Sequence, residues 1–309
     1  MLGIGSFFLD MKKLYSSLFL LFLCYVQAQI DPVKYPTYTS IDDALKSRET
    51  VYSMSFRDKG LFNVPPQIEK LNAIFFLNLM GNKLEKIDEV IFSLKELEIL
   101  NLNENSIKFI PDNIGKLKKL ESLSINLNSL TSINSNLVQL QKLKVIHLDA
   151  NNLSIFPKAL MLIPSLEEIN LQGNQISFIS DELDQITQLK SLNLSSNQMH
   201  DIENVRFPNQ LKYLELQQNT IVKLPDNIFR LRKLEFLNVS QNGIKEVSPN
   251  VKKLKNIVSM NLAHNKLKDL PREISQLKNL KTLILTGNPM ENTTIEKLKL
   301  LIPQTQIYF

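Results

Sequence analysis

The 309-residue chain contains no tryptophan, only three histidines and eight glycines, and a single cysteine, Cys24. One cysteine cannot form an internal disulfide, so packing alone must hold the fold. The histidines, His147, His200 and His264, show no metal-ligand spacing. The few glycines form no phosphate-cradling loop. We therefore expect neither a metal nor another cofactor.

The net charge and the hydrophobic content narrow the class of protein. Charged residues make up 22% of the chain, hydrophobic residues 43%, and the formal net charge is +5. No long charged block or low-complexity run occurs. These values are typical of a folded protein and give no reason to expect a nucleic-acid partner.

The longest apolar run lies near the N-terminus, from Leu14 to Val26, and follows Lys12 and Lys13. Val26 and Ala28 occupy the −3 and −1 positions of a small-residue cleavage site. We predict a signal peptide over residues 1–28 and a protein that is secreted, periplasmic or at the cell surface.

Two alternatives to this signal peptide are weaker. The apolar run is short for a membrane anchor. A lipoprotein signal at Cys24 would follow Phe22 and Leu23, which are bulky where such signals carry small residues. Met11 is a second candidate start, and cleavage after residue 28 would remove the only cysteine.

A repeat organises the rest of the chain. The stretch LEILNLNENSIKFIP, residues 97–111, has the spacing LxxLxLxxNxIxxI. The pattern recurs every 23 residues, with one step of 22, and a degraded first copy begins at Val51 with Lys59 in the asparagine slot. The asparagines of the other ten copies are Asn82, Asn105, Asn128, Asn151, Asn174, Asn197, Asn219, Asn242, Asn265 and Asn288.

Each copy predicts a short strand followed by a tight turn. Leu100 and Leu102 alternate onto one face, whereas Asn101 and Asn103 point the other way. The amide of Asn105 can pair with backbone groups that the turn leaves free. One copy has too few apolar side chains to offset the entropy of ordering it, so neighbouring copies must stack.

This pattern over residues 51–291 resembles the leucine-rich repeat family. The period and the apolar-proline steps resemble both intracellular Ras-pathway scaffolds and bacterial secreted leucine-rich repeat proteins. Those steps are Ile110-Pro111, Phe156-Pro157, Leu224-Pro225 and Leu270-Pro271. The resemblance implies an α/β solenoid of about eleven repeats, a curved horseshoe with a parallel sheet on its concave face, which binds proteins and is not an enzyme.

The two ends of the array need caps. We expect an N-terminal cap over 29–50, with a helix from Ile41 to Ser47 begun by Ser40. We expect a C-terminal cap over 292–309, with a helix over 294–301 capped by Thr293 and a closing strand over 307–309. The one shortened copy, residues 202–211, predicts a local change of curvature and not a domain boundary.

The concave face is the predicted binding surface, because alternate strand residues point away from the core. The asparagine ladder is expected to be structural. Apolar and acidic residues among polar neighbours are the candidate contacts with a protein or peptide partner: Phe76, Ile99, Val145, Glu168, Tyr213, Glu215 and Phe236. Tyr213 and Phe236 lie in adjacent copies, and so do Phe76 and Ile99.

Three other functions stay open at this stage. Lysines collect just before the strands: Lys118, Lys119, Lys142, Lys144, Lys190, Lys212, Lys233, Lys252, Lys253, Lys255, Lys278 and Lys281. They could form a basic edge that recognises glycan or lipid in an adhesin or envelope protein. An intracellular scaffold is possible if the N-terminus is not a signal peptide. Catalysis by Ser124, His147 and Asp149 is disfavoured, because an open surface excludes no water. We expect a monomer.

Overall fold

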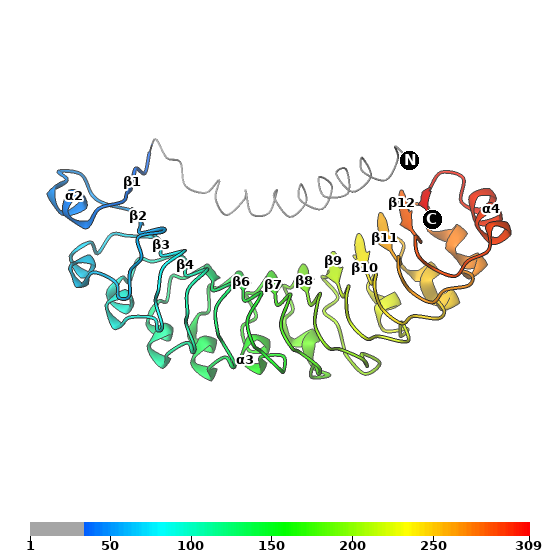
Figure 1. Ribbon diagram of the computed structural model, residues 1–309, viewed down its shortest axis with the longest axis horizontal. Helices are drawn as coiled ribbons and strands as arrows, with labels where there is room; N and C mark the ends of the chain where they lie inside the picture. Colours follow the sequence, from blue (N-terminus) through cyan, green and yellow to red (C-terminus); the bar gives the residue numbers. More distant parts are fainter. Residues whose placement is uncertain (1–33) are drawn as a thin grey trace.

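The computed structural model describes residues 34–309. The predicted signal peptide over 1–28, the choice between Met1 and Met11, and the start of the N-terminal cap lie outside the described residues. Across the described part the chain forms one curved solenoid (Figure 1).

Thirteen parallel strands form a single sheet in sequence order, on the concave side of the arc (Figure 1). The repeat spacing that brings each strand beside the next therefore sets the topology. The strands are β1 (Thr37–Tyr38), β2 (Ser53–Ser55), β3 (Phe76–Asn78), β4 (Ile99–Asn101), β5 (Ser122–Ser124), β6 (Val145–His147), β7 (Glu168–Asn170), β8 (Ser191–Asn193), β9 (Tyr213–Glu215), β10 (Phe236–Asn238), β11 (Ser259–Asn261), β12 (Thr282–Ile284) and β13 (Gln306–Tyr308).

Short helical turns on the convex side return the chain to the next strand (Figure 1). Most are 3-10 helices of one turn, which fit the short connection that a 23-residue period leaves. The 3-10 helices are η1 (Pro66–Lys70), η2 (Glu89–Ser93), η3 (Asp112–Lys116), η4 (Ser135–Gln139), η5 (Leu183–Gln185), η6 (Ile228–Arg230), η7 (Pro249–Lys253) and η8 (Arg272–Gln276). The α-helices are α2 (Ile41–Lys46), α3 (Lys158–Met161) and α4 (Asn292–Leu301).

The core is one continuous stack that runs through the whole arc. The central residue of each strand lies directly above its counterpart in the next, as in Leu77, Leu100 and Leu123, and all three are 0% exposed. The same apolar cluster extends from Ala44 in α2 to Ile302 after α4. The fold is therefore the predicted leucine-rich repeat solenoid.

Each strand from β2 to β12 is followed by a residue in the left-handed region, one position before the ladder asparagine or, after β2, before Lys59. Only three of the repeats place glycine there: Gly81, Gly173 and Gly287, with φ of 71°, 66° and 75°. The others place a residue with a Cβ atom there and carry the cost of a positive φ, which glycine avoids. These residues are Asp58, Glu104, Leu127, Ala150, Ser196, Gln218, Gln241 and His264.

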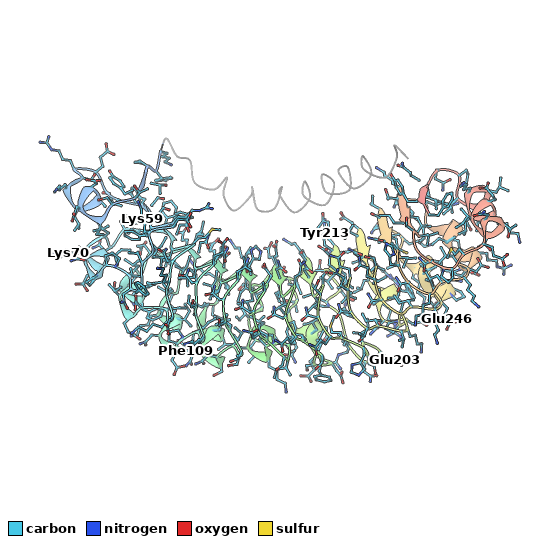
Figure 2. All side chains as sticks on the ribbon, in the orientation of Figure 1. Lys59, Lys70, Phe109, Glu203, Tyr213 and Glu246 are labelled. Carbon is cyan, nitrogen blue, oxygen red and sulfur yellow. The ribbon has the colours of Figure 1, made fainter. Side chains whose placement is uncertain are left out.

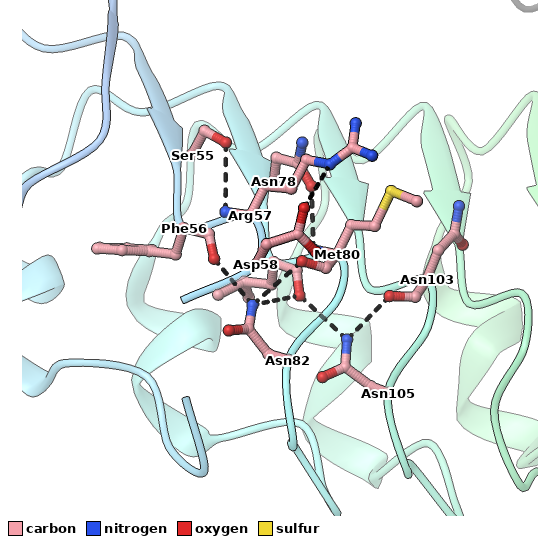
Figure 3. Close-up of polar contacts among 10 residues, drawn as sticks. Ser55, Phe56, Arg57, Asp58, Asn78, Met80, Asn82, Asn103 and Asn105 are labelled. Atoms are coloured by element: carbon pink, nitrogen blue, oxygen red, sulfur yellow. Dashed lines mark hydrogen bonds and ion pairs between the residues drawn. The ribbon is translucent and has the colours of Figure 1, made fainter. Parts of the chain in front are cut away.

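The ladder asparagines join each turn to the turn before it, as Figure 3 shows for Asn82 and Asn105. The Oδ1 of Asn82 accepts from the Leu61 amide at 2.9 Å, and its Nδ2 donates to the Phe56 carbonyl at 2.9 Å. The same Nδ2 donates to Leu79 of its own turn at 2.8 Å. The pattern recurs at every one of the ten positions, so each amide pairs backbone groups of two neighbouring repeats.

The N-terminal end combines a helix with a strand that the sequence did not predict. Helix α2 begins at Ser40, whose hydroxyl accepts from the Asp43 amide at 3.3 Å, and it ends one residue before the predicted Ser47. Strand β1 extends the sheet by pairing with β2. Just before it, the Tyr35 ring packs edge-on against Tyr52 with ring centroids 5.3 Å apart.

The C-terminal helix starts earlier than predicted. Its N-cap is Glu291, whose backbone carbonyl accepts from Thr294 and Ile295 at 3.0 and 3.2 Å. The predicted cap at Thr293 is wrong, because that residue is already inside the helix, and its hydroxyl donates to the Glu291 carboxylate at 3.4 Å. The closing strand β13 pairs with β12 but begins at Gln306 and leaves Phe309 outside.

The shortened repeat between β8 and β9 has no helical turn, yet strand pairing passes through it unbroken. The Asn227 side chain of the next repeat donates to the carbonyls of Ile202, Glu203 and Val205. These bonds satisfy backbone groups that an irregular loop leaves free.

Candidate functional site on the concave sheet

The structure brings the predicted contact residues together on the concave side. Tyr213 and Phe236 are register partners on β9 and β10, and both are partly buried. Figure 2 shows Tyr213 on the inner side of the arc and Phe109 on the outer side. Phe76 and Ile99 pair in the same way on β3 and β4.

The expectation that this row is open to solvent is wrong for three of its members. Ile99 and Val145 are each 7% exposed, and Glu168 is 6% exposed. Parallel strands lie about 4.8 Å apart, so side chains on neighbouring strands pack against one another, and inward curvature brings them closer still. Only parts of the row are therefore available to a partner.

A buried hydrogen-bonded pair lies at the middle of the sheet. His147 Nε2 on β6 is 2.6 Å from Glu168 Oε1 on β7, and both side chains are more than nine-tenths buried. Beside them, the Asp149 carboxylate accepts from the Asn170 side chain at 3.0 Å. Burial raises the pKa of Asp149, and the nearby His147 opposes that shift.

Glu215, at the end of β9, is different from its acidic neighbours. Among residues 34–309 its carboxylate makes no hydrogen bond and no ion pair. Burial, together with the charge of Glu168, raises the pKa of Glu215 to about 7. An isolated carboxylate that loses water without gaining a partner is costly to ionise, which is the physical cause of this shift.

Between β3 and β12 the ionisable groups of the concave face are confined to this region. The concave positions are the first and third residues of each strand and the residue two places beyond it. The only ionisable side chains there other than the Tyr213 phenol are His147, Asp149, Glu168 and Glu215. No lysine or arginine occupies any of these positions, although the chain is basic overall. The centre of the concave face is therefore acidic.

The nucleophilic set considered from sequence does not assemble. Ser124 and His147 are register partners. The His147 ring, however, is hydrogen-bonded to Glu168, and the Asp149 carboxylate is hydrogen-bonded to Asn170. Within residues 34–309, no three histidine, cysteine, aspartate or glutamate side chains come close enough to ligate one metal ion. In the same range no helix has the length and apolarity that crossing a bilayer requires.

The lysine edge is partly neutralised. Four of its lysines form ion pairs with glutamates of neighbouring repeats, because the period aligns both kinds of residue. The pairs are Lys119–Glu96 at 2.5 Å, Lys144–Glu121 at 2.7 Å, Lys190–Glu167 at 2.6 Å and Lys212–Glu235 at 2.9 Å. The positive charge is thus neutralised locally at these four lysines.

A stacked array of short strands, a buried asparagine ladder and a broad polar concave sheet define a leucine-rich repeat solenoid. A family model described as "Leucine-rich repeat region" matches residues 66–207 and 193–303. The chain belongs to the leucine-rich repeat family. Proteins of this family are generally protein-binding, and their fold is typically that of a non-enzymatic scaffold.

Solved structures agree with this assignment. A leucine-rich repeat protein of Leptospira interrogans is 34% identical, with a TM-score of 0.79 over 84% of this chain and 66% of that one. The functional domain of InlJ from Listeria monocytogenes, which includes a cysteine ladder, is 22% identical, with a TM-score of 0.69 over 84% and 53%. With Cys24 as its one cysteine, this chain cannot build such a ladder.

A third similar chain comes from the octameric complex of Latrophilin 3, Unc5D and FLRT2, to which FLRT2 contributes its LRR. It is 22% identical, with a TM-score of 0.72 over 83% of both chains. The two less similar structures show the shared fold alone. This chain spans less than two thirds of the length of the first two. No curated protein sequence matches it.

Proposed function

We propose that this chain is an exported, non-enzymatic binding protein whose concave sheet holds a protein or an extended peptide. The observation that carries the proposal is the pair of aromatic residues, Tyr213 and Phe236, in register on adjacent strands of a largely polar concave face. Aromatic anchors of this kind supply much of the affinity in protein interfaces.

The neighbouring positions support the same function. Asn193 and Asn238 flank Glu215 in register on the adjacent strands, and each amide also donates to a glutamine of the preceding repeat. A polar surface whose amides are held in fixed positions loses little conformational entropy when a partner binds. Such a surface suits recognition by shape and a few anchors.

Export is supported by the basic pair, the apolar run and the Val26/Ala28 cleavage pattern. It is tested by sequencing the N-terminus of the protein recovered from its native cells. A mature chain that begins after residue 28 supports export. A chain that retains residues 11–28 and stays in the cytoplasm would instead favour an intracellular scaffold.

The binding surface is tested with peptides selected from a displayed random library on the full chain. The double variant Tyr213→Ala/Phe236→Ala should bind the selected peptides at least tenfold more weakly, with little change in melting temperature. Phe109→Ala is the matched control, because Phe109 is an exposed ring on the convex side (Figure 2). Equal affinity of the double variant and the unaltered protein would reject the concave surface.

The rival function is recognition of glycan or lipid through a basic edge. It has less support, because four of the lysines that suggested it are paired with glutamates. Salt-sensitive binding to anionic vesicles that survives the Tyr213→Ala/Phe236→Ala change would favour it.

A further inference from the structure

Glu215 is the one charged group of the concave centre that the fold does not use. The Glu168 carboxylate has His147 as a hydrogen-bond partner, and Asp149 has an amide partner. Glu215 has neither, and its register partners on both sides, Asn193 and Asn238, are neutral. The folded chain therefore bears the cost of desolvating this carboxylate and gains no internal contact from it.

A second polar group near Glu215 is also left without a partner. Ser195 is 0% exposed, and its hydroxyl has no hydrogen bond among the described residues. It lies two residues beyond Asn193, whose side chain accepts from the Ser195 amide at 3.0 Å. Strand alternation places Ser195 on the same concave side as Asn193, the register partner of Glu215.

The aromatic rings complete this environment. Tyr213 is on the same strand as Glu215 and the same side of the sheet, and Phe236 lies beside Tyr213 on β10. A ring face attracts a cation, and the attraction grows where water is excluded. A carboxylate without a partner, a free hydroxyl and two rings are complementary to one kind of group, a cationic side chain.

We propose that the concave centre receives an arginine or lysine side chain of the bound peptide, which pairs with Glu215 beside the rings of Tyr213 and Phe236. An arginine is the better fit, because its planar guanidinium can form a forked pair with a carboxylate and stack on a ring. The inference rests on the proposed function, since it names the chemistry of the partner for the same surface.

The charge of the rest of the surface favours this occupant over an acidic one. None of the concave positions from β3 to β12 described above carries a lysine or arginine, so an anionic segment would find no counter-charge there. A basic segment would instead meet the carboxylate of Glu215 and, on the neighbouring repeats, those of Glu168 and Asp149. Charge complementarity of this kind mainly sets partner choice and the rate of association.

The test uses one peptide from the displayed library and a synthetic copy in which citrulline, a neutral analogue, replaces its arginine. Both are titrated against the full chain, Glu215→Gln and Glu246→Gln. Glu246 is an exposed glutamate on the outer side of the arc and serves as the matched control (Figure 2). The citrulline peptide should bind the unaltered protein and Glu246→Gln at least tenfold more weakly than the arginine peptide. On Glu215→Gln the two peptides should bind alike.

The pH dependence supplies an independent readout. A bound cation favours ionised Glu215, so the arginine peptide should bind more tightly at pH 8 than at pH 6. The other titratable groups facing this point are His147 on β6, Asp149 in the turn after β6, Glu168 on β7 and Tyr213 on β9 itself. Their contribution is the pH dependence that remains in Glu215→Gln, and it should be the smaller part.

The outcomes separate this inference from the proposed function. Peptides that require Tyr213 and Phe236 but show no preference between arginine and citrulline would overturn the inference and leave the binding surface intact. Peptides that are indifferent to both the aromatic and the Glu215 variants, or failure to select any peptide, would reject both.

Discussion

Replacing Glu215 by glutamine should stabilise the protein at alkaline pH while weakening its binding to a basic peptide. Glutamine has nearly the same shape but cannot ionise. The carboxylate of Glu215 is partly buried without a partner, and its pKa is raised from 4.5 to about 7. Removing the charge therefore removes a cost that the folded state alone bears.

The direction of the effect follows from proton linkage. Between pH 4.5 and about 7 the folded chain holds a proton on Glu215 that the unfolded chain has released. The folded state therefore binds more protons, and the free energy of unfolding falls as the pH rises through this window. Below it the acid and the glutamine should be equivalent.

The magnitude follows from the same shift. A displacement of about 2.5 pKa units corresponds to roughly 3 kcal/mol, at about 1.36 kcal/mol per unit. Partial exposure of the side chain lets solvent screen the charge, which reduces the expected gain to roughly 2 kcal/mol. The full gain should be present at pH 8 and absent at pH 4.

Urea unfolding at pH 4, 6 and 8, followed by far-ultraviolet circular dichroism, measures the difference. Glu215→Gln should unfold at a higher urea concentration than the unaltered protein at pH 8, with the same dependence on urea. Glu246→Gln should stay within about 0.5 kcal/mol of it at every pH, as expected of an exposed site. The measured quantity is the free energy of unfolding of Glu215→Gln minus that of the unaltered protein. A difference that is no larger at pH 8 than at pH 4 would refute the reasoning.

Three further predictions concern the scaffold and can be checked by the same unfolding assay. Asn174→Ala should lower the free energy of unfolding by about 2–4 kcal/mol, because its amide serves carbonyls of two repeats and accepts one backbone amide; a loss below about 0.5 kcal/mol would contradict a structural ladder. Leu127→Gly should raise the free energy of unfolding by about 0.5–1 kcal/mol, since Leu127 has a φ of 53° and an exposed side chain, whereas Gly173→Ala in the equivalent slot should lower it by about 1 kcal/mol. Lys144→Met should change the free energy of unfolding by less than about 1 kcal/mol despite the 2.7 Å contact between Lys144 and Glu121, because solvent and salt screen these partly exposed groups. A larger loss that persists at high salt would be inconsistent with a surface pair.

The repeat pattern predicts most of the fold because its period is also the geometry of the coil. Leu97, Leu100 and Leu102 are each 0% exposed, as alternation and the turn require. The expected closing strand is present, one residue earlier than predicted. Local pattern is sufficient here because each repeat contacts mainly its two neighbours.

The details at the ends are less predictable. Strand β1 is only two residues long and carries no periodic signal, so its pairing with β2 depends on the exposed sheet edge that β2 would otherwise leave. Thr293 and Glu296 match a capping sequence, but the helix starts earlier, at Asn292, with Glu291 as its N-cap. Capping motifs indicate that a helix begins nearby without fixing its first residue.

What the sequence alone determined is the periodic part of this protein: the strands, the buried apolar face and the places of the ten asparagines. These follow from spacing, because residues a fixed distance apart in the chain must stack. What only the tertiary structure decided is which charges find partners across repeats. His147 meets Glu168, four of the edge lysines meet glutamates about one repeat away, and Glu215 meets no charged partner. Side-chain reach and burial on a curved sheet determine those pairings, and neither is encoded in the period.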